Sequence, residues 1–308
     1  MNNKVAVIDL GTNSLITLIA EKVDNEINII EENYQIIRLG EGLAITGNIS
    51  ENAVQRCIEG FEKVNVLLNN HKIKKINCVA TSALRDAKNG NEIIFKLERK
   101  FKIRIKVISG IDEAKLVSYA TMREFNLKTN KTLIFDIGGG STEFIYLINN
   151  KINFNESLQI GAVRCTEAFL KSDPVLDKEI LKYENYIDGV LAKIPTFNLD
   201  EAIGIAGTVT TLVAVNIGLE KYDSRKIHKS EIDINSVQKI KNQFQNANLE
   251  ERKQIIGLYS KRAEVILAGT IICLQLMKKF NLSKIKVSDK GLRWGLLYQE
   301  FNQSFITS

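Results

Sequence analysis

The sequence predicts an α/β protein built from two similar domains, and three observations support this fold class. Each half opens with an apolar strand that ends in an acid, a glycine and a serine: VAVIDLGTNS from Val5 and TLIFDIGGGS from Thr132. Further strands and then alternating helices and strands follow each turn. The length of 308 residues also favours more than one domain. Two such domains would face each other across a cleft that holds a ligand.

The first half is expected to follow the order β-β-β-α-β-α-β-α. β-branched and apolar runs predict its strands, and apolar residues at helical spacing predict its helices, the first of which Ser50 caps. The expected elements are strands at 5–8, 15–20 and 26–39, a helix at 51–68, a strand at 76–80, a helix at 92–100, a strand at 103–108 and a helix from about 112.

The second half repeats this order and adds helices. Its expected elements are strands at 132–135, 143–148 and 151–158, helices at 163–170 and 178–193, a strand at 202–206, helices at 208–215, 234–256 and 262–279, a strand at 284–287 and a closing helix at 292–303. No Pro/Gly/Ser-rich linker separates the halves. We expect domains at 1–124 and 125–298, with the end of the last helix, about 299–308, joining the first domain.

Composition narrows the class of function. A net charge of +6 and a pI of about 8.9 suit an anionic ligand, without the dense clustering of a dedicated nucleic-acid binder. The four cysteines form no CxxC pair and are expected to be reduced thiols in a cytoplasmic protein. Two histidines argue against a zinc site or a Ser-His-Asp triad. The apolar N-terminal run is too short for a signal peptide, and stretch 265–277 too short for a membrane span.

The two repeated turns are the strongest candidates for a binding site. Successive glycines let backbone N–H groups converge on one point, and such concavities bind phosphate. Acids beside them suit a Mg²⁺ ion that accompanies phosphate. Either turn alone equally suits a plain hairpin, but two in register, 127 residues apart, favour a ligand site. The candidates are Asp9, Gly11, Thr12, Asn13 and Ser14 in the first turn, and Asp136, Gly138, Gly139, Gly140, Ser141, Thr142 and Glu143 in the second.

Other stretches leave two interpretations open. Asp112 and Glu113 start a helix, where acids complement the helix dipole, or one of them is a general base for a hydrolytic water. Arg85 is either a surface ion-pair partner or a phosphate ligand. Gly207 and Thr208 lie at a third strand–helix junction, which is either an ordinary turn or an anion site. The basic stretch 96–106 is typical of a solvated face, with guidance of a long polyanion as the alternative.

Together these stretches resemble the exopolyphosphatase / guanosine pentaphosphate phosphohydrolase (Ppx/GppA) family. The blocks that carry the resemblance span nearly the whole chain: 9–14, TSALRDAKN at 81–89, VISGIDEAKL at 107–116, 136–143, GAVRCT at 161–166, 207–212, RAEVILAG at 262–269 and VSDKGLRWGLL at 287–297. The resemblance implies a duplicated actin-like (ribonuclease-H-like) fold. It also implies removal of terminal phosphate from polyphosphate, or conversion of pppGpp to ppGpp.

The resemblance also assigns roles. It implies that Glu113 is the catalytic base, that Arg85 binds substrate, and that Asp136, Glu143 and Asp9 lie at the metal. The residues that it places against phosphate are Gly11 to Ser14, Gly138 to Thr142, Gly207 and Thr208. It further implies that the enzyme uses Mg²⁺ or Mn²⁺ and a monovalent cation such as K⁺ as cofactors. It also implies that the protein forms a homodimer and binds neither DNA nor a membrane.

Three departures from the family pattern stand out. Ile16 replaces a common arginine, which removes one substrate contact, and Asp112 replaces a common glutamate. Lys290 and Trp294 replace a common arginine and glutamate. The chain resembles the short class that lacks a C-terminal HD-type domain.

The leading hypothesis is therefore an exopolyphosphatase in which Glu113 activates water. A pppGpp phosphohydrolase would use the same turns. An actin-like ATP-binding kinase or ATPase would share the paired turns and would bind ATP tightly. A non-catalytic sensor of polyphosphate or (p)ppGpp would bind without turnover. Phosphate release from polyphosphates, pppGpp and ATP, measured side by side, separates these alternatives.

Overall fold

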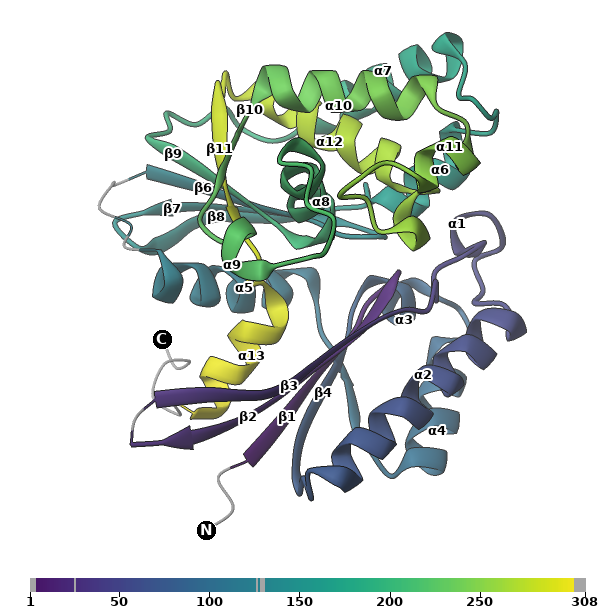
Figure 1. Cartoon of the computed structure of the whole chain (residues 1–308), viewed down its shortest axis with the longest axis vertical. Coiled ribbons are helices and arrows are strands. Elements are labelled where there is room, and N and C mark those ends of the chain that lie inside the picture. The colour runs from purple at the N-terminus through teal and green to yellow at the C-terminus, as the bar shows by residue number, and fades with distance from the viewer. Residues whose placement is uncertain (1–3, 25, 126, 128–130, 302–308) are drawn as a thin grey trace. The chain divides into compact units, whose positions relative to one another are not determined.

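The chain divides into two compact units in a computed structural model that describes residues 4–24, 26–125, 127 and 131–301. Unit 1 comprises Met1–Ala120 and Leu292–Ser308, and unit 2 comprises Thr121–Gly291 (Figure 1). The sequence analysis expected the division at 124/125 and the return to the first domain at about 299. Residues 302–308, which include the last two residues of the closing helix expected at 292–303, lie outside the described residues.

Unit 1 is a five-stranded sheet with helices on both faces. Its elements are β1 (Lys4–Leu10), β2 (Ser14–Val23), β3 (Glu26–Ile36), α1 (Leu43–Thr46), α2 (Glu51–Asn70), β4 (Lys75–Ala80), α3 (Ser82–Asp86), α4 (Gly90–Phe101), β5 (Ile105–Val107), the first part of α5 (Gly110–Glu124) and α13 (Leu292–Phe301). The strand order is β3-β2-β1-β4-β5. Helices α2 and α4 pack on the face that carries Ile8 and Leu10, and α13 contacts β1 and β2.

Unit 2 contains a six-stranded sheet. Its elements are β6 (Lys131–Ile137), β7 (Thr142–Ile148), β8 (Lys151–Leu158), α6 (Ala162–Phe169), α7 (Asp177–Leu191), β9 (Glu201–Ile205), α8 (Ala206–Asn216), α9 (Ser224–Ile227), β10 (Glu231–Asp233), α10 (Ile234–Asn246), α11 (Leu249–Lys253), a 3₁₀ turn (Ser260–Arg262), α12 (Ile266–Lys279) and β11 (Lys284–Ser288). The strand order is β10-β11-β9-β6-β7-β8.

The two sheets share one topology. In each, the first strand pairs antiparallel with the second and parallel with the fourth, as β1 does with β2 and β4 and β6 does with β7 and β9. The register also repeats: Asp9 lies opposite Ile16, and Asp136 lies opposite Glu143. Unit 2 differs by the antiparallel edge strand β10. The duplication predicted from the sequence is therefore present in strand order and in register.

Each unit has its own apolar core. The nearly continuous apolar sequence of α12 is buried in unit 2, where it packs against α6, α7, α8 and α10. All four cysteines are buried and free, as expected. Burial raises the pKa of Cys57 and of Cys273 to about 12, so these thiols stay protonated and unreactive at neutral pH. Their role is packing.

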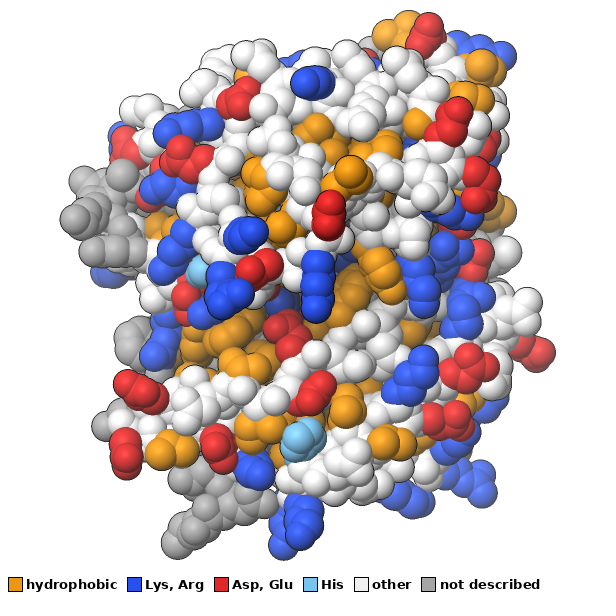
Figure 2. Space-filling view, in the orientation of Figure 1, with side chains coloured by type: hydrophobic (Ala, Val, Ile, Leu, Met, Phe, Trp, Pro, Cys, Tyr) orange, Lys and Arg blue, Asp and Glu red, His pale blue; other side chains and the backbone are white. Residues whose placement is uncertain are grey.

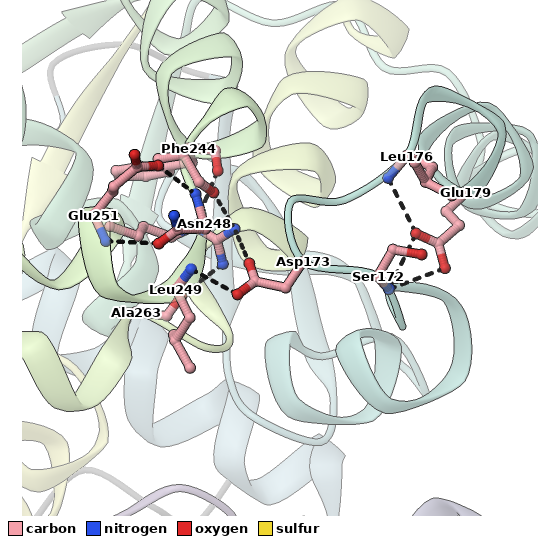
Figure 3. A network of polar contacts seen from close by, with 11 residues as sticks. Ser172, Asp173, Leu176, Glu179, Phe244, Asn248, Leu249, Glu251 and Ala263 are labelled. Atoms are coloured by element: carbon pink, nitrogen blue, oxygen red, sulfur yellow. Dashed lines mark hydrogen bonds and ion pairs between the residues drawn. The ribbon is translucent and has the colours of Figure 1, made fainter.

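Two helices expected from the sequence are wrong in extent. The stretch expected to be helical at 234–256 is two helices, because Asn248 caps α11 by accepting from the Glu251 N–H while Glu251 accepts from the Asn248 N–H (Figure 3). The helix expected at 262–279 begins only at Ile266. Buried Arg252 stabilises the break by donating to the carbonyls of Phe244, Ala247 and Ala263.

The surface carries both signs of charge. On the face shown in Figure 2, acidic and basic side chains are interspersed, and hydrophobic side chains are exposed around α8 in unit 2. Ile217, directly after α8, and Ile256 are exposed hydrophobic residues of unit 2.

Among the described residues, no helix combines the length and the hydrophobicity that a bilayer crossing requires.

Candidate active site

The two glycine turns have the same backbone geometry. The Gly11 N–H donates to the Ser14 carbonyl at 2.9 Å, and the Gly138 N–H donates to the Ser141 carbonyl at 3.0 Å. Each turn thus closes across the two residues between glycine and serine, at equivalent places in the two units. The repeat that the sequence shows as a motif is a repeat of conformation.

The N–H groups inside each turn are available to a ligand. In the described part of the chain, the N–H groups of Thr12 and Asn13, and those of Gly139 and Gly140, have no protein acceptor. The hydroxyl of Thr12 is buried and has no hydrogen-bond partner among the described residues. Unpaired donors at a tight turn form the concavity that binds anions, so both turns fit a phosphate group.

Hydrogen bonds from the start of α6 hold the second turn in place. The N–H groups of Ala162, Val163 and Arg164, at the start of α6, donate to the carbonyls of Gly138 and Gly139. The Arg164 Nε donates to the Gly140 carbonyl at 2.8 Å. The carbonyls are thereby satisfied, and the glycine N–H groups remain for a ligand. The sequence analysis missed Arg164 as a site residue, although it lies in the family block at 161–166.

Unit 1 brings three segments with candidate site residues to one edge of the sheet. Leu10, Ala80 and Val107 lie in register on the parallel strands β1, β4 and β5. The first glycine turn, α3 and the start of α5 therefore leave the sheet at the same edge. Open α/β sheets bind ligands at the carboxyl ends of their parallel strands. This placement unites the first turn, Arg85 and Glu113.

Arg85 and Glu113 form a half-buried pair. The Arg85 Nη1 lies 3.5 Å from the Glu113 Oε2 and donates to the Ile108 carbonyl at 3.1 Å. The Glu113 side chain is 12% exposed, whereas that of Asp112 is 54% exposed and accepts from the Ser109 hydroxyl. Asp112 is thus a helix-start acid at the surface, and Glu113 is the carboxylate that faces Arg85.

The three acids expected at a metal differ in environment. Asp136 and Glu143 are buried on opposite strands of one ladder pair, so they share one face of the sheet. The Glu143 Oε1 accepts from the hydroxyls of Ser141 and Ser157. Burial raises the pKa of Asp9 to about 6, and the Arg293 guanidinium partly opposes this rise. No group of three His, Cys, Asp or Glu side chains gathers around a metal position in the described ranges.

The third junction contains a close approach. A Cβ on Gly207 would lie 1.9–2.1 Å from three atoms of the Arg262 guanidinium, so the guanidinium rests directly on this glycine. A Cβ on Gly269 would lie 2.6 Å from the Thr208 hydroxyl oxygen. Arg262 therefore lies at the start of α8 as an additional cation. The sequence analysis placed it in a family block but did not list it as a site residue.

Unit 2 also assembles its segments at one edge. Asp136, Ile205 and Ser288 lie at matching positions of β6, β9 and β11, so the second turn and the Gly207 junction leave the sheet together.

The Thr142 side chain differs from its neighbours in the second turn because it is not available to a ligand. It is fully buried, and its hydroxyl donates to the Ile160 carbonyl at 2.6 Å, so this side chain supports the turn.

The chain matches the family model described as the Ppx/GppA phosphatase family over residues 18–304. A bifunctional 3-dehydroquinate synthase/phosphatase of Fusobacterium nucleatum is 36% identical over 310 residues, and the alignment covers 96% of this chain but 46% of that protein. Exopolyphosphatase 2 of Mycobacterium tuberculosis is 28% identical over 311 residues, covering 95% of this chain and 97% of that protein. A guanosine-5'-triphosphate,3'-diphosphate pyrophosphatase of Vibrio cholerae is 26% identical over 300 residues, covering 96% of this chain and 58% of that protein.

Solved structures agree with this match. A crystal structure of the Aquifex aeolicus member of the Ppx/GppA protein family has a TM-score of 0.82 and 31% identity, covering 99% of both chains. An exopolyphosphatase from Cytophaga hutchinsonii has a TM-score of 0.90 and 28% identity, covering 99% of this chain and 100% of that chain. The fold is the duplicated actin-like α/β fold that the sequence predicted. The chain belongs to the Ppx/GppA phosphatase family, which confirms the predicted class of enzyme, a hydrolase of phosphorus-containing anhydrides.

Proposed function

We propose that this protein is an exopolyphosphatase that removes the terminal phosphate of inorganic polyphosphate. The observation that carries the proposal is Glu113, a half-buried carboxylate held 3.5 Å from Arg85 at the sheet edge where the first glycine turn emerges. A general base beside a phosphate-binding turn is the arrangement that hydrolysis of a phosphoanhydride needs.

The relatives support polyphosphate as the substrate. The match to exopolyphosphatase 2 covers 97% of that protein, whereas the match to the guanosine pyrophosphatase covers 58% of that protein. The alternative substrate is pppGpp, because glycine turns that bind phosphate through backbone N–H groups would not distinguish what is attached to that phosphate.

The proposed mechanism uses groups of this chain. Oxygens of the terminal phosphate accept from the N–H groups of the first glycine turn, those of Thr12 and Asn13. Glu113 accepts a proton from a water molecule whose oxygen attacks the terminal phosphorus. The bond from that phosphorus to the bridging oxygen breaks, and the bridging oxygen leaves as the end of a chain one phosphate shorter. Arg85 orients the carboxylate and offsets charge on the transferred group. Orthophosphate is the other product.

Asp136 and Glu143 fit a Mg²⁺ ion that accompanies the phosphates. They place two carboxylates on one face of the β6–β7 ladder, and Mg²⁺ in such sites is held by one or two carboxylates together with water and phosphate oxygens. The ion would neutralise charge on the phosphate oxygens. Thermal unfolding with and without Mg²⁺ tests the site: Mg²⁺ should raise the Tm of the wild type, and the Asp136→Asn variant should lose most of this rise.

A phosphate-release assay tests the function. Polyphosphates of several lengths, pppGpp and ATP are compared for the wild type and for the variants Glu113→Gln and Asp112→Asn. Loss of a placed general base lowers rates by about 10²–10⁴-fold, so Glu113→Gln should lose activity on every substrate, while Asp112→Asn, at the exposed neighbour, should keep it. A Glu113→Gln enzyme with the wild-type rate on polyphosphate would remove this mechanism.

The same assay separates the other candidates. Faster release from pppGpp than from polyphosphate would make the protein a pppGpp phosphohydrolase. Tight ATP binding in calorimetry would favour an ATPase or kinase, and binding of polyphosphate without release would favour a sensor. We further propose a homodimer in the cytoplasm, as the resemblance implies, and light scattering of the purified protein measures its oligomeric state.

A further inference from the structure

The segment that follows β3 supports the first glycine turn. The N–H groups of Ile37 and Arg38 both donate to the Asn13 carbonyl at 3.0 Å, and the Gly40 N–H donates to the Thr12 carbonyl at 2.8 Å. We call this segment, from Ile37 to Gly40, the support segment. It satisfies the carbonyls of the two central residues of the turn, as the start of α6 does for the second turn.

The support segment sets the direction of an N–H group in the turn. A trans peptide unit is planar, and its carbonyl and its N–H point to opposite sides. The Thr12 carbonyl and the Asn13 N–H belong to one such unit. Because the carbonyl is held toward Gly40, the Asn13 N–H points away from the support segment. This N–H is one of the two that the first turn offers to a phosphate.

The Thr12 side chain is fixed by the same segment. A Cβ on Gly40 would lie 2.3 Å from the Thr12 Cγ2, so the threonine methyl group occupies the space that any larger residue at position 40 would need. The Thr12 hydroxyl is buried and has no partner in the parts of the chain that the structure describes. A buried hydroxyl without a partner is unfavourable, and a phosphate oxygen would satisfy it.

Arg56, on α2, holds the support segment from its other side. Its Nε donates to the Ile37 carbonyl at 2.8 Å, and its Nη2 donates to the Arg38 carbonyl at 3.0 Å. A planar guanidinium is suited to two acceptors at once. The Ile37 carbonyl and the Arg38 N–H form one peptide unit. That unit is therefore bound by Arg56 at one end and by Asn13 at the other.

Apolar packing alone does not account for this arrangement. Ile37 and Leu39 are buried in the core of unit 1, which fixes where the support segment lies. Their burial does not fix how the peptide units between them are turned. Arg38 has a φ of 48°, a left-handed conformation that is unfavourable for a residue with a Cβ. The two hydrogen bonds from Arg56, to the carbonyls on either side of this φ angle, stabilise the conformation.

We propose that Arg56 is a positioning residue for the first glycine turn. It acts through the support segment, because it fixes the peptide unit whose N–H holds the Asn13 carbonyl. The next unit along the chain, which Arg56 also holds, leads to Gly40 and so to the Thr12 carbonyl. The proposal rests on the proposed function and extends it, because it adds a residue of α2 on which binding of the terminal phosphate depends.

Steady-state kinetics on tripolyphosphate and on long-chain polyphosphate test the proposal. Arg56→Met keeps a similar side-chain volume and removes the donors. The turn binds phosphate in the ground state and in the transition state alike, so KM should rise about tenfold while kcat stays within about twofold of the wild type. Loss of folded protein would instead lower the apparent kcat and leave KM unchanged. Arg56→Lys, with a donor for one carbonyl at a time, should recover part of the difference in KM.

Glu41→Gln is the matched control. Glu41 forms an ion pair with Arg56, and the two side chains are 50% and 34% exposed. Exposed ion pairs contribute little, so this variant should keep the KM of the wild type. If Arg56 acts only through that ion pair, Arg56→Met and Glu41→Gln will change KM equally and the positioning role is wrong. An unchanged KM in Arg56→Met overturns it as well.

Hydrogen exchange, measured without substrate, reports on the support segment itself. In Arg56→Met the amides of Ile37, Arg38 and Gly40 should exchange about tenfold faster than in the wild type, while the amides of β1 and α2 keep their rates. Faster exchange throughout unit 1 would mean that Arg56 only stabilises the fold. Unchanged exchange at the support segment would show that Arg56 does not hold it.

Direct binding keeps this proposal separate from the proposed function. If the wild type releases no phosphate from any substrate, the proposed function fails, and the dissociation constant for tripolyphosphate tests the positioning role instead. Binding about tenfold weaker in Arg56→Met, with Glu41→Gln equal to the wild type, supports the role. Equal dissociation constants for the wild type and Arg56→Met, or no binding by either, overturn it.

Discussion

The Arg85 guanidinium is fixed between a backbone carbonyl and a catalytic candidate: its Nη1 lies 3.1 Å from the Ile108 oxygen and 3.5 Å from the Glu113 Oε2. The Nε also lies 3.6 Å from Asp86. A planar guanidinium meets several partners at once through separate N–H groups. The pair thus depends on arginine geometry and not only on positive charge.

Arg85→Lys should therefore lower kcat for phosphate release. Lysine keeps the charge but cannot hold both partners, and we expect a loss of about 10- to 100-fold. Arg225→Lys is the matched control, since Arg225 pairs with Asp223 in unit 2 through an exposed side chain, and it should retain full activity. Steady-state kinetics with the folded variants decide the point; a fully active Arg85→Lys enzyme would show that only charge is needed.

Gly207→Ala should disturb the third junction without unfolding the protein. The added Cβ would collide with the Arg262 guanidinium, the end of a flexible side chain that can swing away. We expect reduced phosphate release and a nearly unchanged Tm. Gly189→Ala, in the last turn of α7 with nothing within 4 Å of the added Cβ, is the control. It should stabilise unit 2 by about 0.5–1 kcal/mol and leave activity intact. Equal activity of both variants would remove Arg262 from the site.

Asp9 should make stability depend on pH. Its pKa in the folded protein is about 6, against an ordinary value of 3.8, because of burial. The folded state holds this proton more tightly than the unfolded chain, so the free energy of unfolding falls as pH rises from 3.8 to about 6. Above this window the buried carboxylate costs about 3 kcal/mol.

Asp9→Asn removes that cost. We expect the variant to be more stable than the wild type near pH 8 and equally stable near about pH 4. Urea unfolding across this range measures the difference. A stability difference that does not change with pH would mean that Asp9 has an ordinary pKa.

Arg252→Met should destabilise unit 2. The Arg252 side chain is 5% exposed and donates to the carbonyls of Phe244, Ala247 and Ala263, all near the break between α10 and α12. Methionine fills a similar volume but leaves three carbonyls without donors, at a cost of about 3 kcal/mol. The exposed Arg225→Met is the control and should cost less than about 0.5 kcal/mol. Equal unfolding midpoints for the two variants would contradict this role of Arg252.

The sequence by itself determined the duplication, the two glycine turns and the family. These features are local or periodic: VAVIDLGTNS and TLIFDIGGGS each encode a strand, an acid and a turn in neighbouring residues. It erred at 234–256, where helical periodicity continues through a break that the capping box of Asn248 and Glu251 creates. Arg252 stabilises this break through carbonyls inside the stretch and through that of Ala263 beyond it. Periodicity carries no information about such caps.

Only the tertiary structure decided which residues of the candidate site act together within each unit. Asp112 and Glu113 are chemically similar neighbours, and burial against Arg85 separates them. Arg164 and Arg262 reach glycines that lie far from them in sequence. The physical reason is that burial and distance between segments arise from packing, which the order of residues does not express.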